Sequence, residues 1–174
     1  MNTAVRRIVT GHDGNGKSIV LMDGIAANVK EMGATQIVLT ELWETASAPA
    51  SNEGSADAAA RPAQLEPPPH GTILRFVEFP PDEVWMNNAD AIAAFESIGG
   101  ADSHDPNGRA FNHKTKTVDY IIIIKGEITC VLDHGEAQLK AGDVLIQRVT
   151  SHSWSVRGKE PCLLCAVLIS ATPV

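Results

Sequence analysis

The stretch that decides the fold runs from residue 113 to residue 156. It begins His113-Lys-Thr-Lys-Thr-Val-Asp119-Tyr-Ile-Ile-Ile-Ile-Lys-Gly126 and ends, after a turn at 142–143, with His152-Ser-Trp154-Ser-Val156. Successive side chains of a β-strand point to opposite faces, so residues 113, 115, 117 and 119 share one face of an extended strand. If that face lines the inside of a barrel, His113, Thr115 and Asp119 lie on one cavity wall. His152 then faces them from another strand.

Short strand patterns separated by glycine-containing turns continue on both sides of this stretch. Such a series is typical of a β-sandwich or β-barrel. One stretch between them, from Ala89 to Ile98, has the apolar spacing of a short helix and ends at Gly99-Gly100. The sequence therefore predicts an all-β fold with one short helix. The predicted strands cover residues 4–10, 17–23, 35–45, 71–79, 118–124, 127–132, 136–139, 145–148, 152–156 and 163–169, and residues 25–33 form a short connection.

The segment 46–70 has no apolar periodicity and is rich in Ala, Ser, Pro, Asn and Glu. Small and polar residues bury too little surface to offset the entropy lost on ordering. We expect a long surface loop here, inside a single domain that spans residues 1–174. That domain comprises N-terminal strands at 1–45, the loop at 46–70 and the barrel core at 71–170.

Composition excludes several classes of function. The net charge is −7 and the 14 Lys and Arg residues form no run, which argues against a nucleic-acid partner. No segment approaches the roughly 20 apolar residues of a membrane span, and no signal-peptide pattern opens the chain. Three cysteines, an odd number, favour a reducing compartment over a disulfide framework. We expect a cytoplasmic protein without a membrane partner.

Residues 11–18, Gly-His-Asp-Gly-Asn-Gly-Lys-Ser, satisfy the phosphate-loop pattern. A phosphate loop must open a helix whose N-terminus helps to hold the phosphates. Here Ser18 is followed by Ile-Val-Leu-Met-Asp-Gly, which is typical of a strand, and the Asp13-Gly and Asn15-Gly pairs are hairpin-turn signals. The pattern therefore predicts a β-hairpin and no nucleotide.

The first histidine stretch resembles the first conserved motif of the cupin family. His113 stands at that motif's first ligand position and Gly126 at its closing glycine. Thr115 stands where a second histidine is usual, and Asp119 stands where glutamate is usual.

The second histidine stretch resembles the second cupin motif through Gly142 and His152. Gln147, Val149 and Val156 replace its usual Pro, Gly and Asn. The resemblance covers residues 70 to 170 and implies a double-stranded β-helix, the RmlC-like jelly-roll barrel. It also implies a homodimer, for which the apolar strands at 4–10 and 36–43 are candidates.

Metal-binding cupins hold iron, manganese, nickel or zinc with histidines and a glutamate, ligands that suit these metals. The resemblance thus offers His113, Asp119 and His152 as a two-histidine, one-carboxylate metal set. The alternative is that these three residues act directly as catalytic acid and base.

Four further side chains are candidates for substrate binding, and three of them have a structural alternative. Arg75 could hold a substrate carboxylate or phenolate, or it could face solvent. Gln147 could donate to a substrate or cap its own turn. Trp154 could form an aromatic wall or pack in the core. Thr115, on the face of His113, completes the group.

Three functions are consistent with these residues. The first is a small-molecule enzyme with lyase or isomerase chemistry, such as decarboxylation, dehydration or enolisation of an oxygenated metabolite. The second is an iron-dependent dioxygenase. The third is a non-catalytic ligand-binding cupin whose metal site has decayed, which would leave His113 and His152 far apart.

Overall fold

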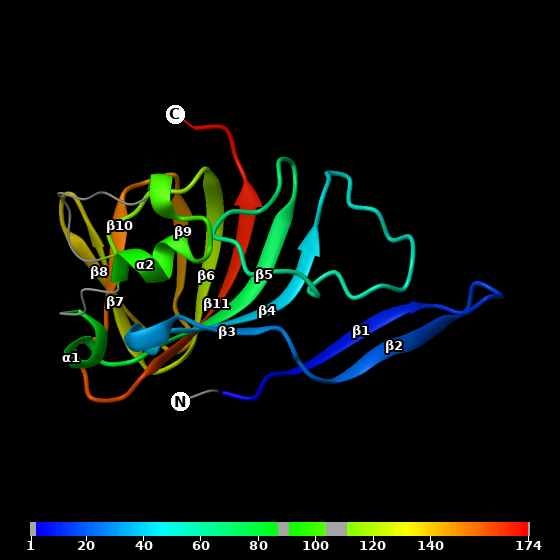
Figure 1. Ribbon diagram of the computed structural model, residues 1–174, viewed down its shortest axis with the longest axis horizontal. Helices are drawn as coiled ribbons and strands as arrows, with labels where there is room; N and C mark the ends of the chain where they lie inside the picture. Colours follow the sequence, from blue (N-terminus) through cyan, green and yellow to red (C-terminus); the bar gives the residue numbers. More distant parts are fainter. Residues whose placement is uncertain (1–2, 87–90, 104–110, 174) are drawn as a thin grey trace.

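Glycine turns and alternating apolar residues produce a chain of short β-strands (Figure 1). The computed structural model describes residues 3–86, 91–103 and 111–173. The strands within these ranges are β1 Arg6–His12, β2 Ser18–Ile25, β3 Val29–Glu31, β4 Val38–Thr45, β5 Thr72–Phe79, β6 Thr117–Lys125, β7 Glu127–Leu132, β8 Glu136–Lys140, β9 Val144–Arg148, β10 His152–Ser155 and β11 Cys162–Ser170. The helices are α1 Asp82–Trp85 and α2 Ala91–Glu96, with 3-10 turns at Gly33–Thr35 and Ala101–Ser103.

Two antiparallel sheets form the barrel. One has the strand order β3-β4-β5-β11-β6-β9 and the other has the order β10-β7-β8. An isolated antiparallel bridge between His113 and His152 joins the segment before β6 to β10, with both backbone N–H···O distances at 3.0 Å. The predicted all-β jelly roll is confirmed.

The inner faces of the two sheets form one apolar core, which also includes Trp85 and Phe95 from the helices. Period-two alternation places Ile73, Ile121, Ile123 and Leu164 inside, each 5% exposed or less. On β6 the same alternation leaves Tyr120 outside, where it is 43% exposed.

Gly126 makes the corner at which the chain leaves the larger sheet after β6 and enters the smaller one at β7. Its φ of +80° suits glycine. A Cβ atom here would lie 2.5 Å from the carbonyl oxygen of Pro161. The glycine is therefore required both for backbone conformation and for the close approach of the neighbouring chain.

The segment that matches the phosphate-loop pattern is a hairpin between β1 and β2, as the turn signals predicted. The Asp13 carboxylate accepts hydrogen bonds from the backbone N–H groups of Asn15 and Lys17 at 2.8 and 2.9 Å. The hairpin extends away from the barrel (Figure 1), and it exposes Ile8, Val20 and Ile25.

The two strands suggested for a homodimer differ in accessibility. The strand predicted at 36–43 corresponds to β4, which is paired on both edges, with β3 and with β5. It is therefore not available for exchange. β1 pairs only with β2 within the described residues and remains the candidate; association of two copies stays a prediction.

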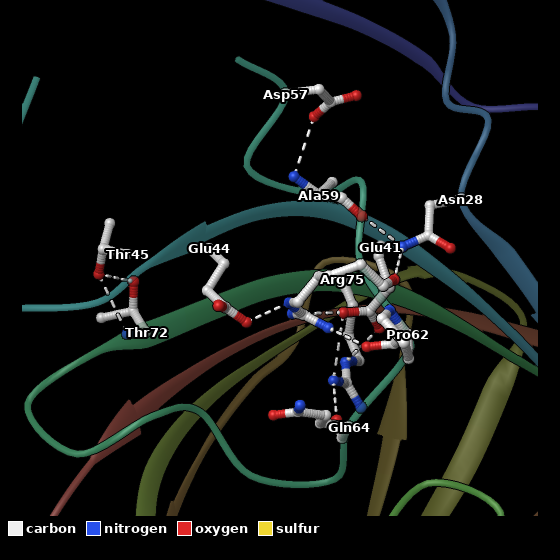
Figure 2. A network of polar contacts seen from close by, with 11 residues as sticks. Asn28, Glu41, Glu44, Thr45, Asp57, Ala59, Pro62, Gln64, Thr72 and Arg75 are labelled. Atoms are coloured by element: carbon white, nitrogen blue, oxygen red, sulfur yellow. Dashed lines mark hydrogen bonds and ion pairs between the residues drawn. The ribbon is translucent and has the colours of Figure 1, made fainter. Parts of the chain in front are cut away.

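The segment 46–70 contains no regular strand or helix, as predicted, but its second half is fixed to the barrel. We call residues 57–66 the strap. Arg61 in the strap forms ion pairs with Glu41 and Glu44, and the Asn28 side chain donates to the carbonyl of Arg61 (Figure 2). Leu65 is 8% exposed and its N–H donates to Ile98. Ion pairs of charged side chains therefore order this part of the loop, and the composition of a segment does not reveal such pairs.

Two predictions about local structure were incomplete. The connection predicted at 25–33 contains β3, and an additional helical turn, α1, precedes α2. In α1 the Asp82 carboxylate accepts hydrogen bonds from Ser155 Oγ and Val156 N–H at 2.6 Å each, and Trp85 is fully buried. The predicted start of the helix at Ala89 lies outside the described residues. No helix in the described part of the chain is long and apolar enough to span a membrane.

Val149 occupies a left-handed backbone conformation with φ of +50° in the turn between β9 and β10. A β-branched residue is strained there by roughly 1–2 kcal/mol. Glycine removes that strain but adds about 0.5–1 kcal/mol of entropic cost to folding. We expect Val149→Gly to raise the free energy of unfolding by up to about 1 kcal/mol. Urea denaturation monitored by tryptophan fluorescence measures this, and an unchanged or lower midpoint contradicts it.

Candidate active site

A mostly apolar cavity lies between the inner faces of the two sheets. Its volume is about 100 Å³. At 10–15 Å³ for each water, this is room for a molecule with on the order of ten non-hydrogen atoms. Leu65, Phe79, Phe95 and Trp154 are among its apolar walls.

Four polar side chains line this cavity, namely Arg75, His113, Asp119 and His152. Each is at least nine-tenths buried. They come from β5, from the segment before β6, from β6 and from β10, so strands distant in sequence meet at one place. The prediction that the histidines and Asp119 share a cavity is confirmed.

The two histidines are neighbours across the bridge that joins the sheets. Their ring centroids are 4.2 Å apart. A decayed metal site was expected to leave the two histidines far apart, so this distance does not support that alternative. His113 Nδ1 lies 2.9 Å from the Phe111 carbonyl oxygen, and His152 Nδ1 lies 3.0 Å from that of Thr150. A carbonyl only accepts, so each Nδ1 carries a proton, and in the neutral ring Nε2 keeps its lone pair. Burial lowers the pKa of His152, which favours this neutral form.

Asp119 is the unusual group in the cavity. It is 5% exposed, and its Oδ1 atom is buried without a hydrogen-bond partner in the described part of the protein. Burial raises the pKa of this carboxyl group to about 6, while a hydrogen bond from Thr117 and the charge of Arg75 oppose the rise. A carboxyl group with this pKa exchanges protons readily near neutral pH.

The raised pKa of Asp119 predicts a pH-dependent stability. The unfolded carboxyl group titrates near its ordinary pKa of 3.8 and the folded one near 6. Between these values the unfolded state binds fewer protons, so stability falls as pH rises through this window and is constant outside it. Two pKa units correspond to about 3 kcal/mol. We expect the free energy of unfolding of the wild type, relative to Asp119→Asn, to fall by about this amount from pH 4 to pH 7. Parallel pH curves for the two proteins contradict it.

Arg75 points into the cavity and not toward solvent, which agrees with one of its two predicted orientations. Its guanidinium is already paired with Glu41. Its Nε lies 3.0 Å from Glu41 Oε1 and its Nη2 lies 3.4 Å from Glu41 Oε2 (Figure 2). Nη2 also donates to the backbone carbonyl of Gln64 in the strap. Desolvation lowers the pKa of Arg75, and the Glu41 charge opposes that effect.

Two predicted substrate-binding residues do not reach the cavity wall, because their polar groups are used internally. The Thr115 hydroxyl lies 2.7 Å from that of Thr117. Gln147 donates to the backbone carbonyl of Thr150 at 3.1 Å and to its hydroxyl, so it fixes the turn before His152. The internal bonds of Gln147 favour its turn-capping alternative, and contact of Thr115 or Gln147 with substrate stays a prediction. Trp154 does line the cavity, with its ring 5.7 Å from that of His152.

The predicted metal set is not assembled by this geometry. Among residues 3–86, 91–103 and 111–173, no three His, Cys, Asp or Glu side chains gather closely enough to hold a metal ion. His113 and His152 adjoin, but Asp119 does not join them as a third ligand. Thr115, where cupins usually place a histidine, forms its hydrogen bond with Thr117. These residues do not fit the metal that the family implies.

Sequence reasoning missed Glu41 and the strap. Glu41 is 1% exposed and pairs with both Arg75 and Arg61. The sequence does indicate that Glu41 faces inward, since it lies two residues from Leu39 on the same face of β4. Identifying it needed the β4–β5 register, which sets Glu41 opposite Arg75.

Comparison with known proteins finds related cupin-domain proteins of fungi, although no protein-family model matches. One relative is the cupin-domain-containing oxidoreductase virC of Hypocrea virens, 25% identical over 97% of this chain and 77% of the relative. Another is the cupin-domain-containing oxidoreductase fogC of Aspergillus ruber, 28% identical over 86% of this chain. This chain spans 63% of the length of that second relative.

Among solved structures, the cupin domain of Schizosaccharomyces pombe Cnp3 is similar with a TM-score of 0.47. It is 13% identical, and the match covers 95% of this chain and 87% of the other.

Proposed function

Since this chain is a member of the cupin superfamily, we propose that it is a small-molecule enzyme that catalyses proton transfer inside its barrel. The reaction class is that of a lyase or isomerase, and the site is best suited to enolisation of a carbonyl compound. The observation that carries this proposal is the partnerless oxygen of Asp119 in an apolar cavity, on a carboxyl group with a pKa of about 6. A general base is most effective when its pKa lies near the working pH.

In this proposal Asp119 removes a proton from the carbon next to the substrate carbonyl. The C–H electron pair becomes the C=C bond of an enolate, and the carbonyl pair moves onto oxygen. The Arg75 guanidinium at the same wall stabilises that oxygen. The protonated Asp119 then returns the proton to the same carbon or to a conjugated one, so an isomer leaves and no other reactant is needed.

The His152 imidazole, whose pKa is lowered by burial, acts as a hydrogen-bond acceptor in this scheme. Its Nδ1 proton is held by the Thr150 carbonyl, so its acceptor nitrogen is Nε2. This nitrogen orients a substrate hydroxyl, while the surrounding aromatic side chains exclude water.

The test uses 2-tetralone, a two-ring ketone of the size that the cavity accepts. We expect the protein to accelerate exchange of the α-protons of 2-tetralone for deuterium in D2O, followed by ¹H NMR. The rate should rise with pH through about 6 as Asp119 loses its proton. A rate equal to that of buffer at every pH contradicts the proposal.

The names of the relatives support a second candidate, an oxidoreductase. This is the class to which an iron-dependent dioxygenase belongs. Elemental analysis of the purified protein, before and after anaerobic reconstitution with iron, separates the two candidates. One iron atom per chain together with oxygen-dependent turnover favours the oxidoreductase, and iron well below one atom per chain favours acid–base catalysis.

A further inference from the structure

The Asp119–Arg75 end of the cavity is built around a small residue. Arg75 on β5 and Asp119 on β6 flank β11, where Arg75 is paired with Ala166 and Asp119 with Leu168. Their strands are two places apart in the sheet, or roughly 10 Å at about 4.8 Å per strand. Ala166, opposite Arg75, and Leu168, opposite Asp119, both line the cavity here, and the small Ala166 side chain fills little of the space beside the guanidinium. This space is where a ligand group would approach both polar groups.

The positive charge at this end is already balanced. Arg75 pairs with Glu41, Glu41 also accepts from Arg61 Nη2 at 2.9 Å, and Arg61 pairs in turn with Glu44 (Figure 2). Two guanidinium groups thus face two carboxylates. Asp119 is outside this network, so a ligand carboxylate would add a second unmatched negative charge to an apolar space.

Both polar groups nevertheless have unused hydrogen-bonding capacity. Asp119 Oδ1 is buried and accepts no hydrogen bond from the described residues. Arg75 Nη2 donates to Glu41 and to Gln64, Nε forms an ion pair with Glu41, and no contact of Nη1 is found in the same part of the chain. A buried acceptor without a donor costs about 1–3 kcal/mol, which a ligand hydroxyl can offset.

We propose that this end of the cavity is a subsite for a neutral, ring-containing molecule that bears a hydroxyl group. The hydroxyl donates to Asp119 Oδ1, and its oxygen accepts from Arg75 Nη1. The rings fill the apolar space beside Phe79 and Trp154. This inference rests on the proposed function, because the preferred ligand has the polarity of an enol. It differs from the expectation that Arg75 holds a substrate carboxylate.

Three matched probes test the subsite by ¹H–¹⁵N NMR titration of the full chain at pH 7.5. They are 2-naphthol, naphthalene and 2-naphthoate, which share one ring system and differ in polar group. We expect 2-naphthol to bind at least tenfold more tightly than either of the others, with shift changes at the amides of Asp119 and Ala166. Equal binding of 2-naphthol and naphthalene, tighter binding of 2-naphthoate, or no binding of any probe overturns the proposal.

The variant Asp119→Leu keeps the branching and the number of non-hydrogen atoms of the side chain and removes the acceptor. We expect it to lose the preference for 2-naphthol and to keep naphthalene binding, which also shows that the cavity is intact. Asp133→Leu, at an exposed turn, is the matched control and should retain the preference. A preference that persists in Asp119→Leu overturns the subsite. If the preference is found but 2-tetralone exchange is not, the subsite stands and the proposed reaction fails.

Discussion

Asp119→Asn should lower the rate of deuterium exchange into 2-tetralone by roughly 10²–10⁴-fold, the usual contribution of a general base. Asparagine has nearly the same shape as aspartate, but its amide does not accept a proton near neutral pH. The fold should survive, because the substitution also removes a carboxylate that is costly to bury. Above pH 6, we therefore predict that Asp119→Asn raises the free energy of unfolding while it lowers the rate of deuterium exchange.

The matched control for this substitution is Asp133→Asn. Asp133 is exposed in the turn between β7 and β8, so its replacement should leave the exchange rate within a factor of two of the wild type. Circular dichroism verifies that each variant is folded. Full exchange activity in a folded Asp119→Asn protein would remove Asp119 from the mechanism.

Replacing Glu41 by Ala should destabilise the protein by about 3–5 kcal/mol. Arg75 is 3% exposed, and losing its carboxylate partner leaves a buried charge without compensation. Arg61 in the strap loses the same partner. Urea denaturation monitored by tryptophan fluorescence measures the change in the free energy of unfolding.

The control is Glu136→Ala, which breaks the ion pair between Glu136 and Arg157 at 2.6 Å. That pair is shorter than the one between Glu41 and Arg75, but both of its side chains are about half exposed. Solvent screening should limit its effect to less than about 1 kcal/mol. The double variant Glu41→Leu/Arg75→Met removes both charges and should recover most of the stability lost in Glu41→Ala. A similar small loss for Glu41→Ala and Glu136→Ala contradicts the buried network.

Period-two alternation was sufficient to predict one half of the site. It placed Asp119 and His113 on one inward face, and Trp154 beside His152, without knowledge of the strand order. Side-chain direction within a strand depends only on local geometry, which sequence reports well. The same argument placed Tyr120 outside, as the structure confirms.

The other half depended on which strands are neighbours. Glu41 becomes the partner of Arg75 only through the β4–β5 register, and a shift in that register between Glu41 and Trp43 is not visible in the sequence. Gln147 was ambiguous for a different reason. Its amide reaches either the cavity or the Thr150 carbonyl, and only the turn conformation before His152 decides between them.

The strap shows a further limit of predicting local structure from amino-acid composition. Its residues predicted a loop, and a loop is found, yet Arg61 and Leu65 attach it to the sheet and to the core. Two anchoring residues hardly change the average composition of a segment that otherwise consists of small and polar residues. Their effect becomes visible only when Glu41 and Ile98 are placed opposite them.

The most direct test of the account is the titration of Asp119 itself, followed through its side-chain carboxyl ¹³C resonance by NMR. We predict a midpoint near pH 6, because the carboxyl group is buried in an apolar cavity and one of its oxygens has no partner in the described part of the chain. Assignment of the resonance is verified by its loss in Asp119→Asn. A midpoint near the ordinary value of 3.8 would contradict the account, since Asp119 would then be solvated or paired and unsuited to act as a base near neutral pH.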